Sequence, residues 1–178
     1  MRDRDDVTDH DDRRGHDALR LDVDSDRAEG GEHGALLGHG AVDHHRDRGG
    51  RVPAVAGIPV THRGVAHDFT VVSGHLPPGH EDSLLDWDAL GRLRGTVVLM
   101  MAVANAPAIA EALVAAGRSP RTPVGIVCDG TMPAERTVLG TLGSIRDDIA
   151  THDVRPPAII VVGDVVAVAH PERFGPLA

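Results

Sequence analysis

The stretch GTVVLMMAVANAPAIAEALVAAG, residues 95–117, combines a strand pattern and a helix pattern in direct succession. Residues 95–103 form a nearly continuous apolar run rich in β-branched side chains, which is typical of a strand buried on both faces of a sheet. Residues 105–117 predict a helix, with Asn105 as its N-terminal cap and Gly117 at its end. The stretch therefore predicts a buried strand followed at once by a helix.

The same alternation continues on both sides of this unit. Further apolar runs at residues 68–75, 123–130 and 158–169 predict strands. A shorter and more polar run at residues 135–142 predicts an edge or antiparallel strand. Amphipathic segments at residues 83–93 and 142–153 predict helices. The strand at 158–169 is expected to bend at Gly163. Alternating strands and helices predict an α/β domain over residues 51–178, with a mainly parallel sheet flanked by helices.

The first 50 residues differ from the rest in composition. They hold 8 Arg, 14 Asp or Glu and 6 of the 12 His, but no Ile, Phe, Trp or Pro. So few apolar side chains cannot bury enough surface to offset the entropy of ordering, and residues 1–50 are expected to be a disordered, low-complexity segment. His44 and His45 are the densest pair of histidines. Nothing around them would fix the geometry that a metal requires, so no metal site is predicted.

Composition also limits the classes of function. The net charge of −9 argues against non-specific nucleic-acid binding, which needs a cationic surface. Cys128 is the only cysteine, which rules out an internal disulfide and favours a reducing compartment. The apolar runs are too short to span a bilayer or to act as a signal peptide. We expect a soluble cytoplasmic protein with no nucleic-acid or membrane partner.

No single short motif assigns a chemistry. The chain has no Walker loop, no GxGxxG between a strand and a helix, no CxxC and no GxSxG. His75, His80, Glu81 and Asp82 cluster in one segment, which we interpret as a polar loop between a strand and a helix. Ligands of α/β sheets bind outside the carboxyl ends of strands, which directs attention to residues 100–105 and 128–131.

Several longer segments together resemble one known family. In order along the chain, they are GIPVTHRG (57–64), FTVVSGH (69–75), GTVVLMMAVAN (95–105), PVGIVCDGT (123–131) and PPAIIVVGDVV (156–166). Their order and spacing resemble the C-terminal half of S-adenosylmethionine-dependent uroporphyrinogen-III C-methyltransferases, which are tetrapyrrole methylases. The first segment is specific to this branch, and the last is shared more widely. The resemblance runs from about Val52 to about Ala169.

The resemblance implies an enzyme of two α/β subdomains that binds S-adenosyl-L-methionine between them and forms a homodimer. It implies transfer of two methyl groups to uroporphyrinogen III, giving precorrin-2 for sirohaem and cobalamin biosynthesis. By the family's motifs, Met101, Gly130 and Ala158 are expected to line the cofactor, Gly130 because it lacks a Cβ that would keep a ligand from the backbone. Arg63 is expected to face the carboxylates of the tetrapyrrole. No residue is assigned as catalytic.

The chain also departs from the family. It lacks the GPGDP-like cofactor loop and the acidic catalytic segment of the N-terminal subdomain, and it contains no Lys. A non-catalytic fragment or dimerising half domain, and a methylase of a later corrin intermediate, therefore stay open as alternatives. Residues 1–50 are either a genuine tail or an out-of-frame reading of the lost subdomain. The surface that this subdomain would cover is expected to be apolar and exposed.

Overall fold

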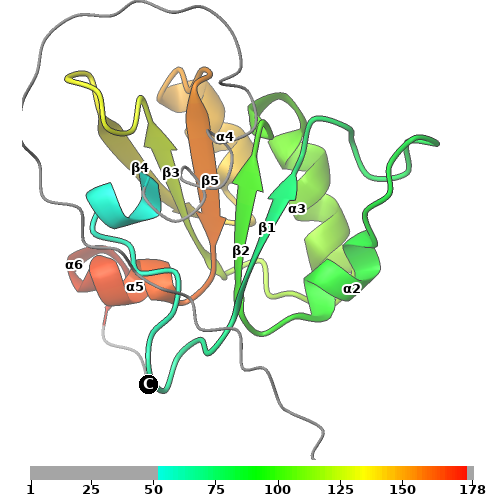
Figure 1. The fold of residues 1–178 in the computed structure, drawn as a ribbon, viewed down its shortest axis with the longest axis horizontal. Helices are drawn as coiled ribbons and strands as arrows, with labels where there is room; N and C mark the ends of the chain where they lie inside the picture. The colour runs from blue at the N-terminus through cyan, green and yellow to red at the C-terminus, as the bar shows by residue number, and fades with distance from the viewer. Residues whose placement is uncertain (1–51, 176–178) are drawn as a thin grey trace, which may run out of the picture. The chain divides into compact units, whose positions relative to one another are not determined.

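The computed structural model describes residues 52–175, so the expectation of disorder for residues 1–50 lies outside the described residues. A helical turn at residues 52–55 comes first. The elements that follow are β1 (Phe69–Ser73), α2 (Trp87–Arg92), β2 (Thr96–Met100), the 3-10 turn η1 (Val103–Asn105), α3 (Ala106–Ala115), β3 (Pro123–Cys128), β4 (Arg136–Thr141), α4 (Ile145–Thr151), β5 (Ala158–Val162), α5 (Val165–Ala169) and α6 (Pro171–Phe174). The predicted α/β class is confirmed (Figure 1).

The five strands form one sheet in the order β1-β2-β5-β3-β4. Only β1 and β2 pair in parallel, whereas β2 with β5, β5 with β3, and β3 with β4 pair antiparallel. The prediction of a mainly parallel sheet is therefore wrong. Strands joined by a helix do run in the same direction, as the alternating pattern implies. However, β5 is inserted between β2 and β3, and β3 lies between β4 and β5, so most neighbours in the sheet run in opposite directions.

The apolar run at residues 158–169 divides into a strand and a helix at Gly163. Its φ of 149° is a conformation that side-chain-bearing residues rarely adopt, and its amide donates to the carbonyl oxygen of Pro123 at 2.9 Å. The predicted bend is thus present, but the continuation as a strand is wrong. Val165 and Val166 begin α5 although β-branched residues favour strands, because both side chains are fully buried there. Burial outweighs local propensity at this point.

The sheet has a hydrophobic core on each face. Helices α2, α3 and α4 cover one face, while α5, α6 and residues 52–60 lie on the other (Figure 1). Val97 of β2 packs in the first core and its neighbour Val98 in the second, as the alternation of side chains along a strand requires. All five residues of β2 are buried, which confirms the reading of this run as a central strand.

The helix that follows β2 begins differently from the prediction. Asn105 makes no capping hydrogen bond, because its side chain bonds elsewhere, and the first turn is the 3-10 turn η1. Gly117, with a φ of 109°, does follow the end of α3 as predicted. The carboxylate of Asp86 caps α2 by accepting the amide of Ala89 at 2.8 Å. No helix within residues 52–175 is long and apolar enough to cross a membrane.

Candidate functional site

The three residues expected to line the cofactor lie at one end of the sheet. Met101 directly follows β2, Gly130 follows β3 by two residues, and Ala158 opens β5. Their strands are neighbours, because the last residues of β2 and of β3 both pair with the first residues of β5. Met101 and Gly130 share this end because β2 and β3 run in the same direction, and the antiparallel insertion of β5, which the sequence does not predict, places Ala158 between them.

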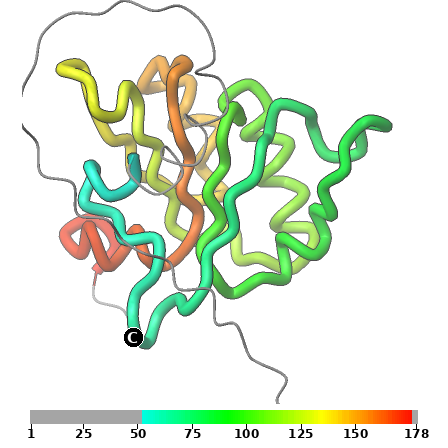
Figure 2. Tube along the Cα trace, viewed as in Figure 1, coloured from blue at the N-terminus to red at the C-terminus, as the bar shows by residue number. Residues whose placement is uncertain are grey.

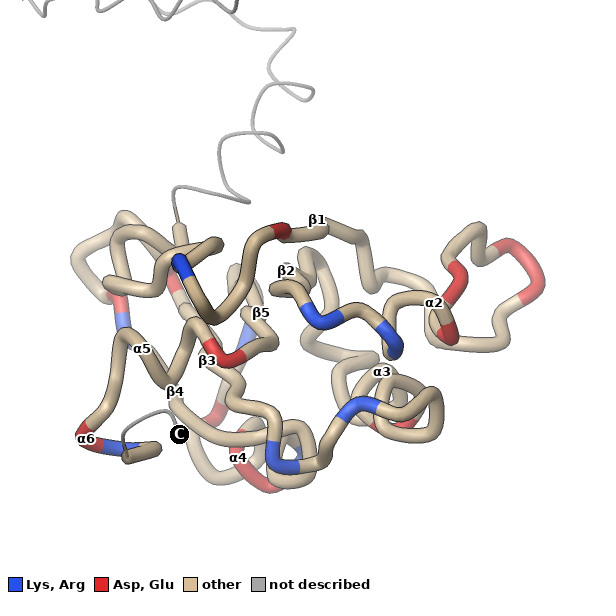
Figure 3. Tube along the Cα trace, turned by 90° about the horizontal axis from the view of Figure 1, so that it is seen from below, with Lys and Arg blue, Asp and Glu red and all other residues tan. Residues whose placement is uncertain are grey.

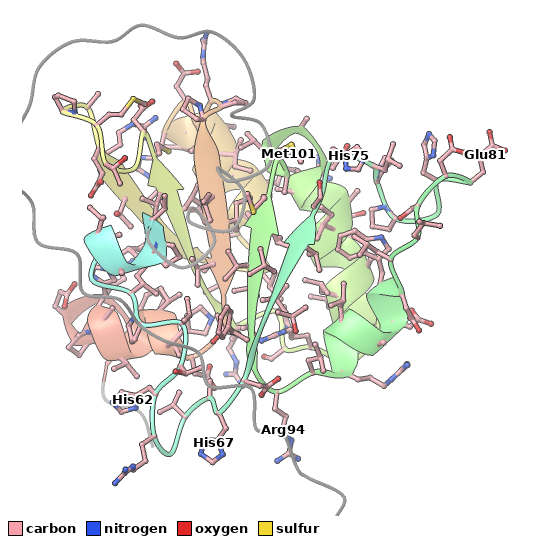
Figure 4. The ribbon with its side chains drawn as sticks, in the orientation of Figure 1. His62, His67, His75, Glu81, Arg94 and Met101 are labelled. Atoms are coloured by element: carbon pink, nitrogen blue, oxygen red, sulfur yellow. The ribbon has the colours of Figure 1, made fainter. Side chains whose placement is uncertain are left out.

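Met101 presents an exposed thioether at this end of the sheet. Its side chain is 54% exposed, whereas Met100 and Ala102 on either side are buried. Its φ of 52° is unusual for a residue with a side chain. Figure 4 shows Met101 beside the upper ends of β1 and β2. Of this triplet, only Met101 therefore offers its side chain to a ligand.

Gly130 lies between Asp129 and Thr131, which both have positive φ, at 52° and 72°. A Cβ at Gly130 would lie 2.5 Å from Cγ1 of Val52, so the glycine is required by packing against the segment that precedes β1. A ligand contact at Gly130 would therefore use its backbone. Met132 in the same loop is 45% exposed and adds a second thioether that the sequence reasoning missed.

His75 also lies at this end, near Met101 (Figure 4). Its Nδ1 is 2.8 Å from the hydroxyl oxygen of Ser73, and this hydrogen bond fixes the plane of the exposed ring. The sequence predicts a polar loop that contains His75 together with His80, Glu81 and Asp82. A histidine two residues after a strand, next to a glycine, is the signal that could have singled it out.

The rest of that predicted polar cluster lies elsewhere. The loop between β1 and α2 projects away from the sheet (Figure 2) and is rich in acidic residues (Figure 3). In this loop Nδ1 of His80 accepts the amide of Asp82 at 3.1 Å, and Glu81 is exposed. The structure therefore separates His75 from the three other members of the cluster. No three His, Cys, Asp or Glu side chains within residues 52–175 are grouped as metal ligands would be.

Arg63 lies at the opposite end of the sheet from Met101. It is exposed in a turn that the backbone of His62 and Ala66 closes, with the His62 amide donating to the Ala66 carbonyl at 2.9 Å. Figure 4 shows His62 at the foot of the sheet and Met101 at its top. Within one chain, Arg63 therefore does not join the cofactor candidates, and its contact with a tetrapyrrole stays a prediction.

Cys128 is the last residue of β3 and is fully buried. Burial raises the pKa of its thiol, and the carboxylate of Asp129 acts in the same direction, against the opposing charge of Arg136. The thiol is therefore protonated at neutral pH and cannot act as a nucleophile.

These features describe an α/β domain whose candidate site lies at the end of the sheet where β2 and β3 stop and β5 starts. Residues 51–146 match the family model of the Tetrapyrrole (Corrin/Porphyrin) Methylases. The chain belongs to this family, which confirms the resemblance that its motifs indicate.

Individual relatives agree with the family. The S-adenosyl-L-methionine-dependent uroporphyrinogen III methyltransferase of Methanosarcina barkeri is 44% identical over 115 residues, which are 65% of this chain and 45% of the relative. The uroporphyrinogen-III C-methyltransferase of Methanocaldococcus jannaschii is 43% identical over 118 residues, 66% of this chain and 48% of the relative. This chain spans less than half the length of the curated relatives that it matches.

A solved structure supports the same placement. The crystal structure of the uroporphyrin-III C-methyl transferase from Thermus thermophilus complexed with S-adenyl homocysteine superposes with a TM-score of 0.55. It is 37% identical in sequence, and the match covers 66% of this chain and 48% of that one. The α/β fold of the described residues is thus the fold of about half of that enzyme.

Proposed function

We propose that this chain forms the C-terminal half of an S-adenosyl-L-methionine-dependent uroporphyrinogen-III C-methyltransferase, which makes precorrin-2 for sirohaem and cobalamin biosynthesis. The convergence of Met101, Gly130 and Ala158 at one end of the sheet carries this proposal. The 37% identity to a structure described as complexed with S-adenyl homocysteine supports it, as do the printed names of the relatives.

The residues at this end suit an S-adenosyl ligand. The exposed thioethers of Met101 and Met132 offer a polarizable, apolar surface, and the small side chain of Ala158 leaves room beside them. When bound, the cofactor supplies an electrophilic methyl group on a sulfonium, so the protein needs no nucleophile of its own. The task of these residues is to bind and align. His75 is exposed, so its Nε2 can exchange a hydrogen bond with a substrate.

The proposed substrate is a polycarboxylate, which suits an arginine. Arg63 remains our proposed contact, although it lies at the opposite end of the sheet from Met101. A homodimer in which one protomer presents its Arg63 to the substrate of the other reconciles these two positions. We also propose a cytoplasmic location, since Cys128 is a buried free thiol of the kind that reducing compartments maintain.

The second candidate is a ligand-binding or dimer-forming fragment without catalysis. It is the second candidate because the described residues bring the proposed cofactor contacts together but include no residue assigned as catalytic. A methylase of a later corrin intermediate has only a likeness of fold behind it. The cobalt precorrin-4 methyltransferase structure has a TM-score of 0.59 but is 21% identical in sequence.

Calorimetric titration with S-adenosylhomocysteine tests the cofactor site. We expect binding by the wild-type chain and roughly tenfold weaker binding by Met101→Ala, because this variant loses the contact between the Met101 thioether and the ligand that would cover it. Leu84→Ala, at a 99% exposed residue outside the site, serves as the control. Absence of binding at high micromolar ligand would refute the proposal. Binding without formation of precorrin-2 from uroporphyrinogen III would favour the non-catalytic fragment.

A further inference from the structure

The loop between β3 and β4 holds side-chain-bearing residues in a costly backbone conformation. Thr131 has a φ of 72° and Asp129 a φ of 52°. Positive φ is especially unfavourable for a β-branched residue such as threonine. Residues in such conformations persist only where the surrounding structure fixes them. The loop must therefore contain groups that hold Thr131 in place.

Glu135 supplies such a group. Its Oε2 accepts the amide of Thr131 at 2.6 Å, a short hydrogen bond strengthened by the carboxylate charge. Two backbone hydrogen bonds fold the loop so that this side chain can reach back. The amide of Met132 donates to the carbonyl of Asp129, and the amide of Glu135 donates to the carbonyl of Met132, both at 2.9 Å.

The positive-φ residues of this loop lie outside the paired part of the β3–β4 hairpin. Pairing of the two strands is complete from Pro123 with Thr141 to Cys128 with Arg136, before the loop begins. The positive-φ residues other than glycine in the described part of the chain are Met101, Asp129, Thr131 and Asp153. All four lie in loops at the end of the sheet where β2 and β3 stop and β5 starts. Strain gathered at one end is typical of a preorganised binding site.

We propose that Glu135 is a positioning residue for the ligand-facing loop at residues 129–132. Its carboxylate holds Thr131 in the left-handed conformation and thereby presets the loop before a ligand arrives. The identity of that ligand as an S-adenosyl compound rests on the function proposed above, whereas the hold on the loop does not. From the sequence alone, Glu135 is only the first residue of an edge strand.

The hold on the loop is tested without any ligand, by solvent exchange of the Thr131 amide in NMR. We expect Glu135→Ala to exchange at least about tenfold faster than the wild type, and Glu135→Gln to restore most of the protection because its amide oxygen can still accept. Glu81→Ala, which removes an exposed carboxylate from a distant loop, is the control and should change nothing. Unchanged exchange in Glu135→Ala would overturn the proposal.

A double-mutant cycle separates a hold on the backbone from a general effect of charge. Thr131→Gly removes the strain, because glycine adopts positive φ freely. Glycine keeps the backbone amide that Glu135 accepts, so Glu135→Ala loses the same hydrogen bond in both backgrounds, but only in the wild type is part of this loss offset by relief of strain as the loop relaxes. The shift in the urea midpoint caused by Glu135→Ala should therefore be larger in the Thr131→Gly background than in the wild type. Equal shifts in both backgrounds would mean that the loop keeps its conformation without Glu135, and would overturn the proposal.

Titration with S-adenosylhomocysteine then tests the role toward the ligand. Glu135→Ala should weaken binding about tenfold, because the ligand must then order a loop that the wild type holds in place before binding. Glu135→Gln should bind nearly as the wild type does, because it keeps the hydrogen bond to Thr131. Unaltered binding by a Glu135→Ala variant whose Thr131 exchange is fast would overturn the positioning role. If the wild type itself does not bind, the proposed function fails, and the exchange and cycle experiments still decide whether Glu135 holds the loop.

Discussion

Asn105 donates a hydrogen bond from Nδ2 to the carbonyl oxygen of Gly74 at 2.8 Å, across 31 positions of the chain. The amide of Gly74 in turn donates to the carbonyl of Met100 at 2.8 Å, so Gly74 is hydrogen-bonded both to the last residue of β2 and to the 3-10 turn that follows it. A Cβ at Gly74 would lie 2.6 Å from that of Ala102, so the loops approach too closely for any larger residue. The position of His75 relative to Met101 therefore depends on Asn105.

Loss of this hydrogen bond should loosen the candidate site. We expect Asn105→Ala to lower the free energy of unfolding by about 1–2 kcal/mol, the range for a partly buried hydrogen bond. Asn105→Asp should cost more, because a carboxylate of the same shape would face the Gly74 carbonyl without a donor. Urea unfolding measures both values. Leu84→Ala, at a 99% exposed residue, is the control, and an Asn105→Asp variant as stable as the wild type would contradict the prediction.

At the other end of the sheet, Arg118 joins two strands through its guanidinium. Nη2 donates to the carbonyl of Gly95, just before β2, at 2.7 Å, and more weakly to that of Val162, the last residue of β5, at 3.5 Å. Burial lowers the pKa of this guanidinium, while the carboxylates of Asp164 and Asp68 act in the opposite direction. Nη1 is buried and has no partner among the described residues.

Arg118→Ala should therefore destabilise the domain by about 2–4 kcal/mol, because it removes a buried side chain and leaves the Gly95 carbonyl without this donor. Arg118→Met should cost less, since methionine fills most of the space and the unpaired Nη1 disappears with the charge. Arg94→Ala, at an exposed position nearby, is the control. Denaturant unfolding gives the free energy of unfolding of each of the three variants. An Arg118→Ala variant as stable as the wild type would show that the carbonyls of Gly95 and Val162 are satisfied without the guanidinium.

Cys128 should govern stability in alkaline solution. Its pKa is raised in the folded state, so its contribution is fully present below the unfolded value of about 8.5 and is lost as pH rises through the folded value. The chain has no Lys and no Tyr, so few other groups titrate in this range. We expect the free energy of unfolding to fall by up to about 1.4 kcal/mol per pH unit above pH 9, and the fall to be much smaller in Cys128→Ala. Equal slopes for both proteins would refute this assignment.

The strand and helix patterns predict most elements of this domain but neither the strand order nor the mainly antiparallel pairing. Strands joined by a helix do run in the same direction, but a local pattern does not show that β5 enters between β2 and β3. The run at residues 165–169 is predicted to be strand because three of its five residues are β-branched valines, but it forms a helix because Gly163 breaks the strand and the second core buries Val165 and Val166. These differences arise from tertiary contacts that no local window contains.

The candidate site likewise contains residues that the sequence predicts and residues whose role only the fold reveals. Strand ends direct attention to Met101 and Gly130, and the structure brings both to one end of the sheet together with Ala158. The groups that hold this end, Asn105 and Glu135, act through backbone atoms whose positions depend on the fold. Asn105 in particular has the sequence pattern of a helix cap, and only the approach of Gly74 directs its side chain elsewhere.

One surface of β1 matches the apolar face expected where a second subdomain would pack. Phe69 and Val71 point to the same face as Val98, yet they are 45% and 40% exposed, because α5, α6 and residues 52–60 cover other parts of that face. β1 is also an edge strand of the sheet. Exposed apolar residues on an edge strand favour association with other chains.

We therefore predict that the purified chain self-associates through this face and binds a hydrophobic dye. Replacing Phe69 and Val71 by threonine keeps the preference for strand structure and removes apolar surface, so sedimentation velocity should show a shift toward monomer and dye fluorescence should fall several-fold. Leu84→Ser is a matched control, because Leu84 is 99% exposed but stands alone on the loop before α2. Its loss should change neither measurement, since single exposed apolar residues are common on protein surfaces. A wild-type chain that is monomeric and dye-free, or a double variant that associates as strongly as the wild type, would show that this face is not the one that associates.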